Sequence, residues 1–262
     1  MILGTCQRNR PIENIIKIHR AWSGQTIPFS ILAFMDFNDK KNNLSLDRLF
    51  HLKLNPYEGA NNSSFMINKG IRIYTETTHE FIQLIGDDCF PAHSDYFKVC
   101  LDLMDDYDII MPKLIRCDPG FIAPDFDSIN DKSYKEFISS AKPEWQIYYN
   151  EGAIFTKFEV FKTLRGYDET YVGWGYEDKD FIKRAEKIGY RVKKLDPPYH
   201  LVHSYHPRVM MHSEEAEINR RIYNLTLQNK LPLLRMDENW GLRNKPKINI
   251  ELRNLLAKRG KI

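Results

Sequence analysis

The chain has 262 residues, which is enough for one large domain or two small ones with a substantial hydrophobic core. Hydrophobic residues make up 42% of it and charged residues 28%, so the composition is that of a globular protein and not of a disordered one. Because 38 Lys and Arg face 35 Asp and Glu, the net charge is only +3, and nucleic acid is not expected as the main partner.

The sequence shows no apolar run near the ~18 residues of a membrane span, and its first residues lack the pattern of a signal peptide. Four cysteines are scattered without a C-x-x-C pair, which argues against a disulfide framework and against a structural zinc site. We therefore expect a cytoplasmic protein with reduced thiols at Cys6, Cys89, Cys100 and Cys117.

Strands and helices are expected to alternate through the first part of the chain. Short apolar runs predict strands over residues 1–6, 29–35 and 80–85, and the apolar spacing of residues 62–76 predicts a helix. A further helix is predicted to begin at Pro11. This alternation predicts an α/β fold with a largely parallel sheet.

Polar residues follow each of these three strands: Arg8 and Arg10, then Asp36, then Asp87 and Asp88. In open α/β sheets, ligands bind beyond the carboxyl ends of the strands. Guanidinium groups suit phosphate, and a hard cation such as Mn²⁺ or Mg²⁺ takes a few protein oxygens and completes its shell with phosphates. Solvated arginines and a simple Gly-Asp-Asp turn are the alternatives.

The second half of the chain is less regular. Residues 118–143 form a long acidic, Pro-containing loop region, of a kind that is usually functional or mobile in a compact domain. Apolar patterning predicts strands over residues 109–115, 145–156, 190–195 and 200–205, and helices over residues 158–164 and 177–188.

Four of the eight histidines fall within 13 residues, at positions 200, 203, 206 and 212. An isolated histidine is more often structural, but this clustering favours a metal site. On a straight strand, residues three apart face opposite sides, so His200 and His203 could share an ion only if the chain bends between them.

A second group of candidate site residues begins at Tyr171. Glycines on both sides of Trp174 would let its indole project from a loop and stack on a sugar ring. Glu177, Asp178 and Asp180 then occupy the first turn of a predicted helix. Acidic residues also favour helix N-termini for purely structural reasons, so the acids alone do not require a site.

The C-terminal residues 241–262 differ from the rest in charge, with seven Lys and Arg, one Glu and a net charge of +6. Ile248, Leu252, Leu255 and Leu256 could line an amphipathic helix. This segment is interpreted either as a terminal helix docked on the core with a solvated basic face, or as a peripheral contact with anionic lipid or a lipid-linked acceptor.

Taken together, these stretches resemble a known family. Gly173-Trp-Gly-Tyr-Glu-Asp-Lys-Asp180 is similar to the GWGGEDDD signature of the β-1,4-galactosyltransferases and to the GWG-ED motif of bacterial chondroitin-polymerase-type glycosyltransferases. The resemblance covers roughly residues 1–210. Other segments agree in order: Cys6–Arg10 with an FRNR loop, Met66–Gly70 with an LLNVG helix, Ile85–Pro91 with a DVD-x-x-P metal motif, and His200–His203 with an M-x-x-H ligand pair.

The resemblance implies a GT-A fold, in which a mixed α/β sheet is flanked by helices, over residues 1–240. Residues of about 1–115 would form the nucleotide-sugar half and residues of about 145–210 the acceptor and metal half. The basic helical tail at 241–262 would follow. This region would transfer, with inversion, a hexose or N-acetylhexosamine from a UDP-sugar to a hydroxyl of a glycan or lipid-linked glycan, in surface polysaccharide synthesis on the inner face of a membrane.

The resemblance also implies roles for single residues. Asp88, His203 and His200 would bind Mn²⁺ or Mg²⁺, and Asp178 would be the general base. The remaining assignments are Arg8, Arg10, Asp36, Asp87 and Trp174 for the nucleotide sugar, and Trp174, Glu177 and Lys179 for the acceptor.

Three positions depart from the family pattern: Gly86 replaces the first Asp of DVD, Tyr176 the second glycine of GWGG, and Lys179 an acceptor-facing Asp. Two other classes of protein stay open as alternatives. One is a nucleotidyltransferase or UDP-sugar hydrolase on the same fold, and the other is a non-catalytic carbohydrate-binding module.

Overall fold

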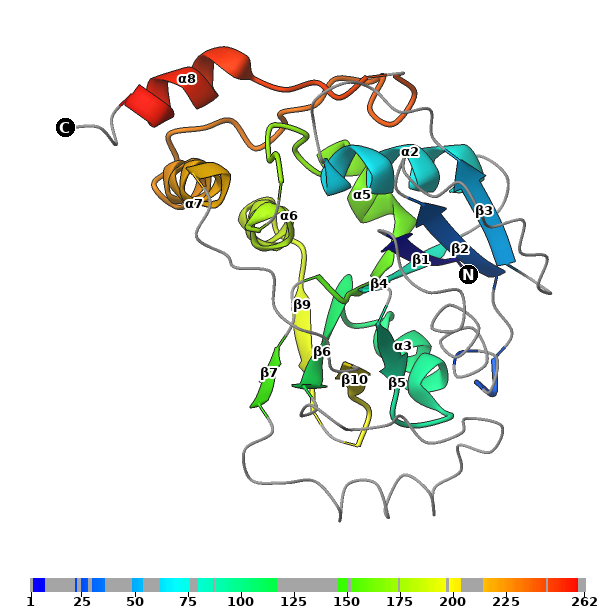
Figure 1. The fold of residues 1–262 in the computed structure, drawn as a ribbon. Helices are drawn as coiled ribbons and strands as arrows, with labels where there is room; N and C mark the ends of the chain where they lie inside the picture. The colour runs from blue at the N-terminus through cyan, green and yellow to red at the C-terminus, as the bar shows by residue number, and fades with distance from the viewer. Residues whose placement is uncertain are drawn as a thin grey trace. The chain divides into compact units, whose positions relative to one another are not determined.

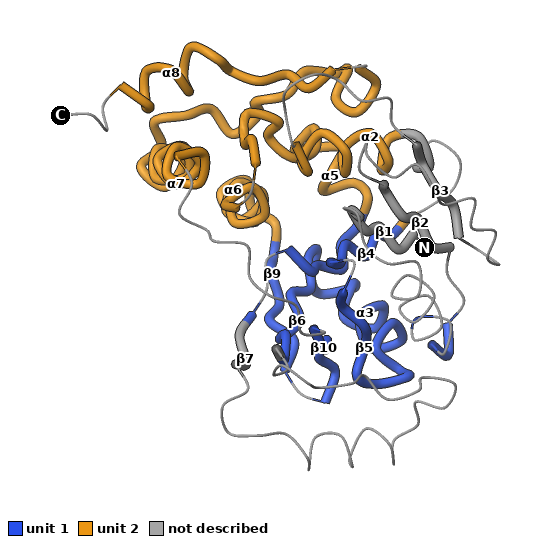
Figure 2. The backbone as a smooth tube through the Cα atoms, in the orientation of Figure 1, with its two compact units in different colours: residues 1–53, 81–157, 191–207 blue, residues 54–80, 158–190, 208–262 orange. Residues whose placement is uncertain are grey.

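The computed structural model divides the chain into two compact units (Figure 2). Unit 1 comprises residues 1–53, 81–157 and 191–207, and unit 2 comprises residues 54–80, 158–190 and 208–262. The structure describes residues 2–7, 22, 25–27, 30–35, 49–53, 62–75, 80–86, 88–116, 146–149, 152–173, 175–196, 198–203, 214–243 and 245–258. The helix predicted to begin at Pro11 and the loop predicted at 118–143 lie outside these residues.

Unit 1 is built on one mixed sheet, in which ten strands belong to the described residues (Figure 1). The strand order is β3-β2-β1-β4-β8-β6-β10-β5, and β7 and β9 also pair with β6. The strands are β1 (Ile2–Gln7), β2 (Ser30–Met35), β3 (Leu49–Lys53), β4 (Phe81–Gly86), β5 (Cys89–Pro91), β6 (Ile109–Arg116), β7 (Gln146–Tyr149), β8 (Phe155–Lys157), β9 (Val192–Leu195) and β10 (Leu201–His203).

The predicted parallel pairing holds for one side of the sheet. Strand β1 is parallel to β2 and β4, and β2 is parallel to β3. Strands β5, β7 and β8, however, run antiparallel to β10, β6 and β4 respectively, so the sheet is mixed. The four central residues of β4 are all buried, as expected for a strand covered on both faces.

The stretch 145–156, predicted as one strand, forms two. Strand β7 pairs with the second half of β6, whereas β8 pairs with the first half of β6 and with β4. Gly152 lies in a turn just before β8. The prediction of a single strand was therefore wrong.

The core of unit 1 lies between the sheet and helix α3 (Tyr96–Leu103). Trp22 is completely buried and its ring lies 5.1 Å from Phe97 and 5.8 Å from Tyr96, centroid to centroid. Its indole N–H donates a hydrogen bond of 3.0 Å to the Cys89 carbonyl oxygen. The aromatic core thereby fixes the start of β5.

Three helices of unit 2 follow the predicted periodicity closely, since the predictions for residues 62–76, 158–164 and 177–188 are confirmed to within one residue at each end. Rings of Phe161 and Phe181 stack 4.5 Å apart, with Tyr167 beside them. The helices are α2 (Ser63–Thr75), α5 (Phe158–Leu164), α6 (Glu177–Lys187), α7 (Glu214–Leu227) and α8 (Ile250–Lys258).

Helix α8 lies within residues 241–262, the C-terminal segment with a net charge of +6. Leu256 is buried in a cluster with Ile218 and Ile222 of α7. Several basic side chains of the segment are engaged inside unit 2, since Arg243 and Lys247 pair with Asp237, and Arg253 pairs with Glu215. Within the described part of the chain, no helix combines the length and the apolar character that crossing a bilayer requires.

Candidate active site

Strand pairing in unit 1 gathers three possible metal ligands. Strand β10 runs antiparallel to β5, and His203 lies directly opposite Cys89 in the register. Side chains of directly opposed residues point to the same face of a sheet and have Cβ atoms about 4.5–5.5 Å apart. Asp88 immediately precedes β5, and its carboxylate lies beside the His203 imidazole.

The three side chains form a compact cluster. The Asp88 Oδ2 atom lies 3.5 Å from His203 Nε2, and each of the two side chains is 13% exposed. The Cys89 thiol donates a 3.3 Å hydrogen bond to Asp88 Oδ1. One ligand atom of each residue lies within 4.8 Å of the others. Carboxylate, imidazole and sulfur are all ligands of divalent metal ions, so this donor set fits a cation.

Gly86 leaves space for this cluster. A Cβ atom at position 86 would lie 2.7 Å from Asp88 Oδ1 and 3.2 Å from Cys89 Sγ. The first distance is shorter than real Cβ contacts, so the carboxylate would have to move. The glycine that departs from the DVD pattern is therefore coupled to the local arrangement of Asp88 and Cys89.

His200, which the resemblance implies as a ligand, is 1% exposed. Its backbone carbonyl accepts a hydrogen bond from the Ala92 N–H at 3.0 Å. Burial, together with the nearby charge of Lys113, lowers the pKa of His200 to about 4, so its imidazole is neutral at neutral pH. Among the described residues, the gathered group consists of Asp88, Cys89 and His203 and does not include His200.

The structure does not place every residue that the sequence singles out. Arg8, Arg10, Asp36, Asp87 and Trp174 lie outside the described residues.

The loop before α6, in unit 2, has an unusual backbone. Gly173 and Gly175 have φ values of +78° and +99°, and Tyr176 has a φ of +74°. Glycine adopts such angles freely, whereas a side chain opposes them. The Tyr176 ring packs against Tyr223 of α7, 5.6 Å between centroids. This contact explains how tyrosine is held at a position where the related motif has glycine.

The first turn of α6 presents two acids near the surface. Asp178 is half-buried, and its Oδ1 accepts a 2.7 Å hydrogen bond from the Lys179 backbone N–H. Glu177 Oε1 accepts a hydrogen bond of 3.2 Å from the Ser63 hydroxyl at the start of α2. Lys179 is exposed, and its Nζ lies 5.7 Å from the centre of the Tyr176 ring.

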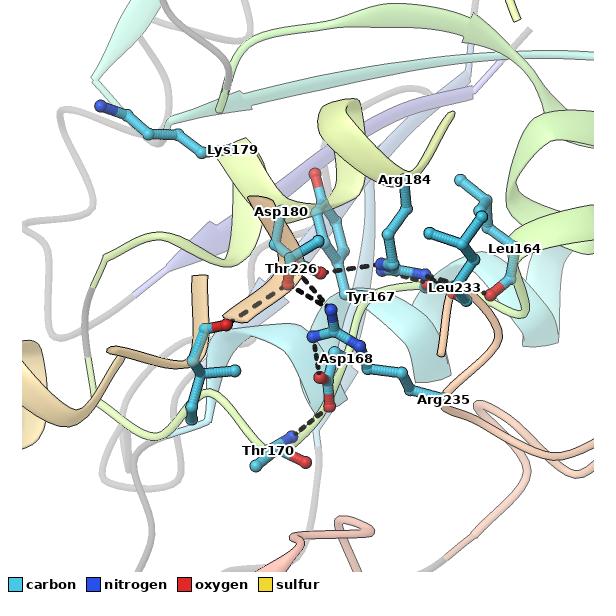
Figure 3. A network of polar contacts seen from close by, with 12 residues as sticks. Leu164, Tyr167, Asp168, Thr170, Lys179, Asp180, Arg184, Thr226, Leu233 and Arg235 are labelled. Carbon is cyan, nitrogen blue, oxygen red and sulfur yellow. Dashed lines mark hydrogen bonds and ion pairs between the residues drawn. The ribbon is translucent and has the colours of Figure 1, made fainter. Parts of the chain in front are cut away.

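The third acid of this turn points inward. Asp180 is fully buried and binds Arg184 at 2.7 Å, Arg235 at 3.1 Å and the Thr226 hydroxyl at 2.7 Å (Figure 3). Burial alone would raise the pKa of Asp180, but the charges of Arg184 and Arg235 outweigh it and hold the pKa below its usual value. Figure 3 shows Lys179 directed away from this network. Asp180 is therefore a structural acid.

Sequence reasoning missed two residues that hold the motif loop, by which we mean residues 167–176 before α6. Asn68 donates from Nδ2 to the Tyr167 carbonyl at 2.9 Å and accepts at Oδ1 from the Tyr167 N–H at 2.7 Å. Asn62 donates to the Glu169 carbonyl at 2.6 Å and forms a bridge with Gly173. Both asparagines are far from the loop in sequence, so no local spacing could have identified these contacts.

Comparison with known proteins gives a family match over part of the chain. The family model described as the N-terminal domain of galactosyltransferase matches residues 137–208, a stretch that includes Asp178 and His203. No curated protein matches the chain significantly.

Solved structures show the same fold. S. aureus TarS 1–349, in complex with UDP-GlcNAc, has a TM-score of 0.59 and 14% identity, over 91% of this chain and 68% of that one. The mannosyltransferase PcManGT from Pyrobaculum calidifontis, in complex with GDP-Man and Mn²⁺, has a TM-score of 0.52 and 12% identity. The match covers 98% of this chain and 68% of that chain. A second structure of S. aureus TarS has a TM-score of 0.57 and 13% identity, and the match covers 90% of this chain and 40% of that chain.

Proposed function

We propose that this chain, a glycosyltransferase with the GT-A fold, transfers a hexose or N-acetylhexosamine from a UDP-sugar to a glycan hydroxyl, with inversion and with a divalent cation. The observation that carries the proposal is the 3.5 Å approach of Asp88 and His203, which stand far apart in the sequence. A carboxylate and an imidazole brought together at strand ends of this fold form a site for a cation-bound diphosphate.

Asp88 and His203 would hold the cation, Mn²⁺ or Mg²⁺, and their limited exposure keeps competing water away. A divalent cation bound there would supply positive charge to the diphosphate, on which negative charge develops as UDP departs. The solved structures of similar fold contain UDP-GlcNAc and GDP-Man with Mn²⁺, which supports a nucleotide sugar as the donor.

Residues that the structure does not describe complete the proposed donor site. Arg8 and Arg10 would bind the diphosphate through their guanidinium groups, because planar guanidinium forks match phosphate oxygens. Asp36 and Asp87 would bind the nucleoside and sugar, and the Trp174 indole would stack against the sugar rings.

Asp178 would accept the proton of the acceptor hydroxyl while that oxygen attacks the anomeric carbon from the face opposite UDP. The hydrogen bond from the Lys179 backbone fixes one of its carboxylate oxygens, which orients the base. Glu177, held by Ser63, and the exposed Lys179 would contact the acceptor. A glycan or lipid-linked glycan in surface polysaccharide synthesis is the acceptor that we infer.

The test is a panel of UDP-sugars, incubated with Mn²⁺ and with oligosaccharide acceptors. We expect UDP release and an elongated glycan for one donor, and loss of both in excess chelator. Pyrophosphate as the product would instead identify a nucleotidyltransferase, and free sugar without an elongated glycan would identify a hydrolase. Full activity in chelator would contradict the role of the cation, and no turnover of any nucleotide sugar would favour a binding module.

A further inference from the structure

Cys89 occupies a rigidly defined position beside Asp88 and His203. Its carbonyl oxygen accepts the hydrogen bond from the Trp22 indole at 3.0 Å, and its backbone pairs with His203 across β5 and β10. The side chain is buried, with 1% exposure. The sulfur is therefore held on the face of the sheet that carries the His203 imidazole.

The thiol already interacts with one of the proposed metal ligands. Its proton points to Asp88 Oδ1 across 3.3 Å, and sulfur, carboxylate oxygen and imidazole nitrogen all lie within 4.8 Å of one another. A cation that binds at this place would take over the position of the thiol proton, because a thiol coordinates metals as the thiolate.

The neighbouring glycine strengthens this interpretation. The space beside residue 86 is taken by Cys89 Sγ and Asp88 Oδ1, at 3.2 and 2.7 Å from the place of a Cβ atom. A chain with a side chain at position 86 could not keep both groups where they are. The glycine thus leaves room for the Asp88 carboxylate, with the Cys89 sulfur close beside it.

We propose that Cys89 is a third protein ligand of the cation, and that its sulfur makes the site select against Mg²⁺. The proposal deepens the proposed function, on which it rests for the location of the cation. Mg²⁺ requires a nearly octahedral shell of oxygen ligands. Imidazole and thiolate favour softer transition metals, whose affinities rise from Mn²⁺ to Co²⁺. The site therefore binds Co²⁺ more tightly than Mn²⁺, and Mn²⁺ more tightly than Mg²⁺.

Cys100 provides a matched comparison within the same unit. It is also fully buried, and burial raises the pKa of its thiol far above the ordinary range. Its neighbours include the Tyr96 ring, and it does not belong to the group formed by Asp88, Cys89 and His203. Its thiol shares a hydrogen bond with the Tyr96 side chain, so Cys100 is a buried cysteine without the metal-binding partners of Cys89.

The experiment is a titration of the full chain with Co²⁺, followed by the thiolate-to-cobalt charge-transfer band. We expect the wild-type chain and Cys100→Ser to show the band, and Cys89→Ser to lose it while Co²⁺ affinity falls by at least the about 10- to 100-fold that loss of a supporting residue costs. As the S–Co bond forms, the thiol proton passes to the buffer. Competition of bound Co²⁺ with Mn²⁺ and Mg²⁺ then measures selectivity, and we expect Cys89→Ser to narrow the preference for Mn²⁺ over Mg²⁺.

The band of the wild-type chain does not depend on whether any variant folds. Co²⁺ binding without this band would overturn the inference, as would an unchanged band in a folded Cys89→Ser variant. The proposed function fails differently, through absence of sugar transfer from every UDP-sugar. If the chain shows the band but transfers no sugar, Cys89 is a ligand and the glycosyltransferase assignment is wrong. If the chain transfers sugar with Mn²⁺ but shows no sulfur ligation, the glycosyltransferase assignment holds and Cys89 is not a ligand.

Discussion

His203 on β10 lies 3.5 Å from Asp88, which immediately precedes β5, the antiparallel neighbour of β10. Replacing Asp88 by Asn removes the negative charge of a proposed ligand, and replacing His203 by Ala removes the imidazole. We expect Mn²⁺ affinity to fall by more than the about 10- to 100-fold that loss of a supporting residue costs. Electron paramagnetic resonance of free Mn²⁺ measures this directly.

The control for these variants is Asp102→Asn, since Asp102 is an exposed carboxylate on α3 and lies outside the cluster. Its Mn²⁺ affinity should equal that of the wild-type chain. Unchanged affinity in both Asp88→Asn and His203→Ala would show that the cation binds elsewhere.

Asp178→Asn tests the proposed general base. The amide keeps the size of the side chain but cannot accept the hydroxyl proton, so the rate of sugar transfer should fall by about 10²- to 10⁴-fold. UDP and Mn²⁺ affinities should stay unchanged, because the variant alters no proposed ligand of either. Single-turnover kinetics and calorimetry separate the two effects. Glu186→Gln, an exposed acid near the other end of α6, is the matched control.

A transfer rate in Asp178→Asn within about threefold of the wild-type rate would remove Asp178 from the mechanism, since general-base catalysis contributes far more than this. The same loss in Glu186→Gln would point instead to an effect on the whole helix.

The elements of this fold that sequence predicts well are those with a clear period and clear ends. Helix α6 has apolar residues at helical spacing and a glycine after its end, and residue 177 is correctly predicted as its first residue. Strand β4 is apolar except for Gln83, and its central residues are buried as such a run predicts. In both cases local sequence and tertiary burial agree.

Some shorter elements escape prediction because contacts distant in sequence, and not a local period, decide where they form. Strand β5 has three residues and α3 has eight, and their places depend on contacts with Trp22 and β10 that are distant in sequence. The 14-residue helix α7 is different, since its acidic first turn and its apolar spacing were available signals that were overlooked.

In the candidate site, too, local sequence predicts some residues and distant contacts determine others. The carboxylate and imidazole of the metal cluster follow from motif order, but the contribution of Cys89 depends on the β5–β10 register, which no local pattern contains. Asp180, by contrast, looks like its neighbours in the sequence and differs from them only because Arg184 and Arg235 enclose it.

Tyr176 tests the backbone of the motif loop. Tyr176→Ala removes the ring from Tyr223 and keeps a side chain at a φ of +74°, whereas Tyr176→Gly removes the ring and relieves the backbone as well. We expect the glycine variant to be more stable than the alanine variant by about 1 kcal/mol. Denaturant unfolding of the two variants, side by side, measures the difference. Equal stability, or a more stable alanine variant, would contradict a left-handed backbone at this residue.

Asp180 is expected to govern acid stability in unit 2. Asp180→Asn leaves the buried Arg184 and Arg235 without their counter-charge, and breaking a buried ion pair typically costs about 3–5 kcal/mol. The pKa of Asp180 is lowered in the folded state, so its contribution is complete above the unfolded pKa of about 4 and is lost as the pH falls through the folded value. The stability gap between wild type and Asp180→Asn should therefore be constant near neutral pH and shrink in acid.

Unfolding midpoints of the two proteins, measured in urea from pH 7 downward, determine this gap. Glu159→Gln is the control, because Glu159 is an acid in the first turn of α5 whose partner Lys162 is itself exposed, and such pairs contribute little. A gap that keeps its full size below the folded pKa would mean that the lost contribution is packing and not charge. The arginines would then be held by their bonds to the Leu164, Gly166 and Leu233 carbonyls and to Asp168, without any need for the Asp180 carboxylate.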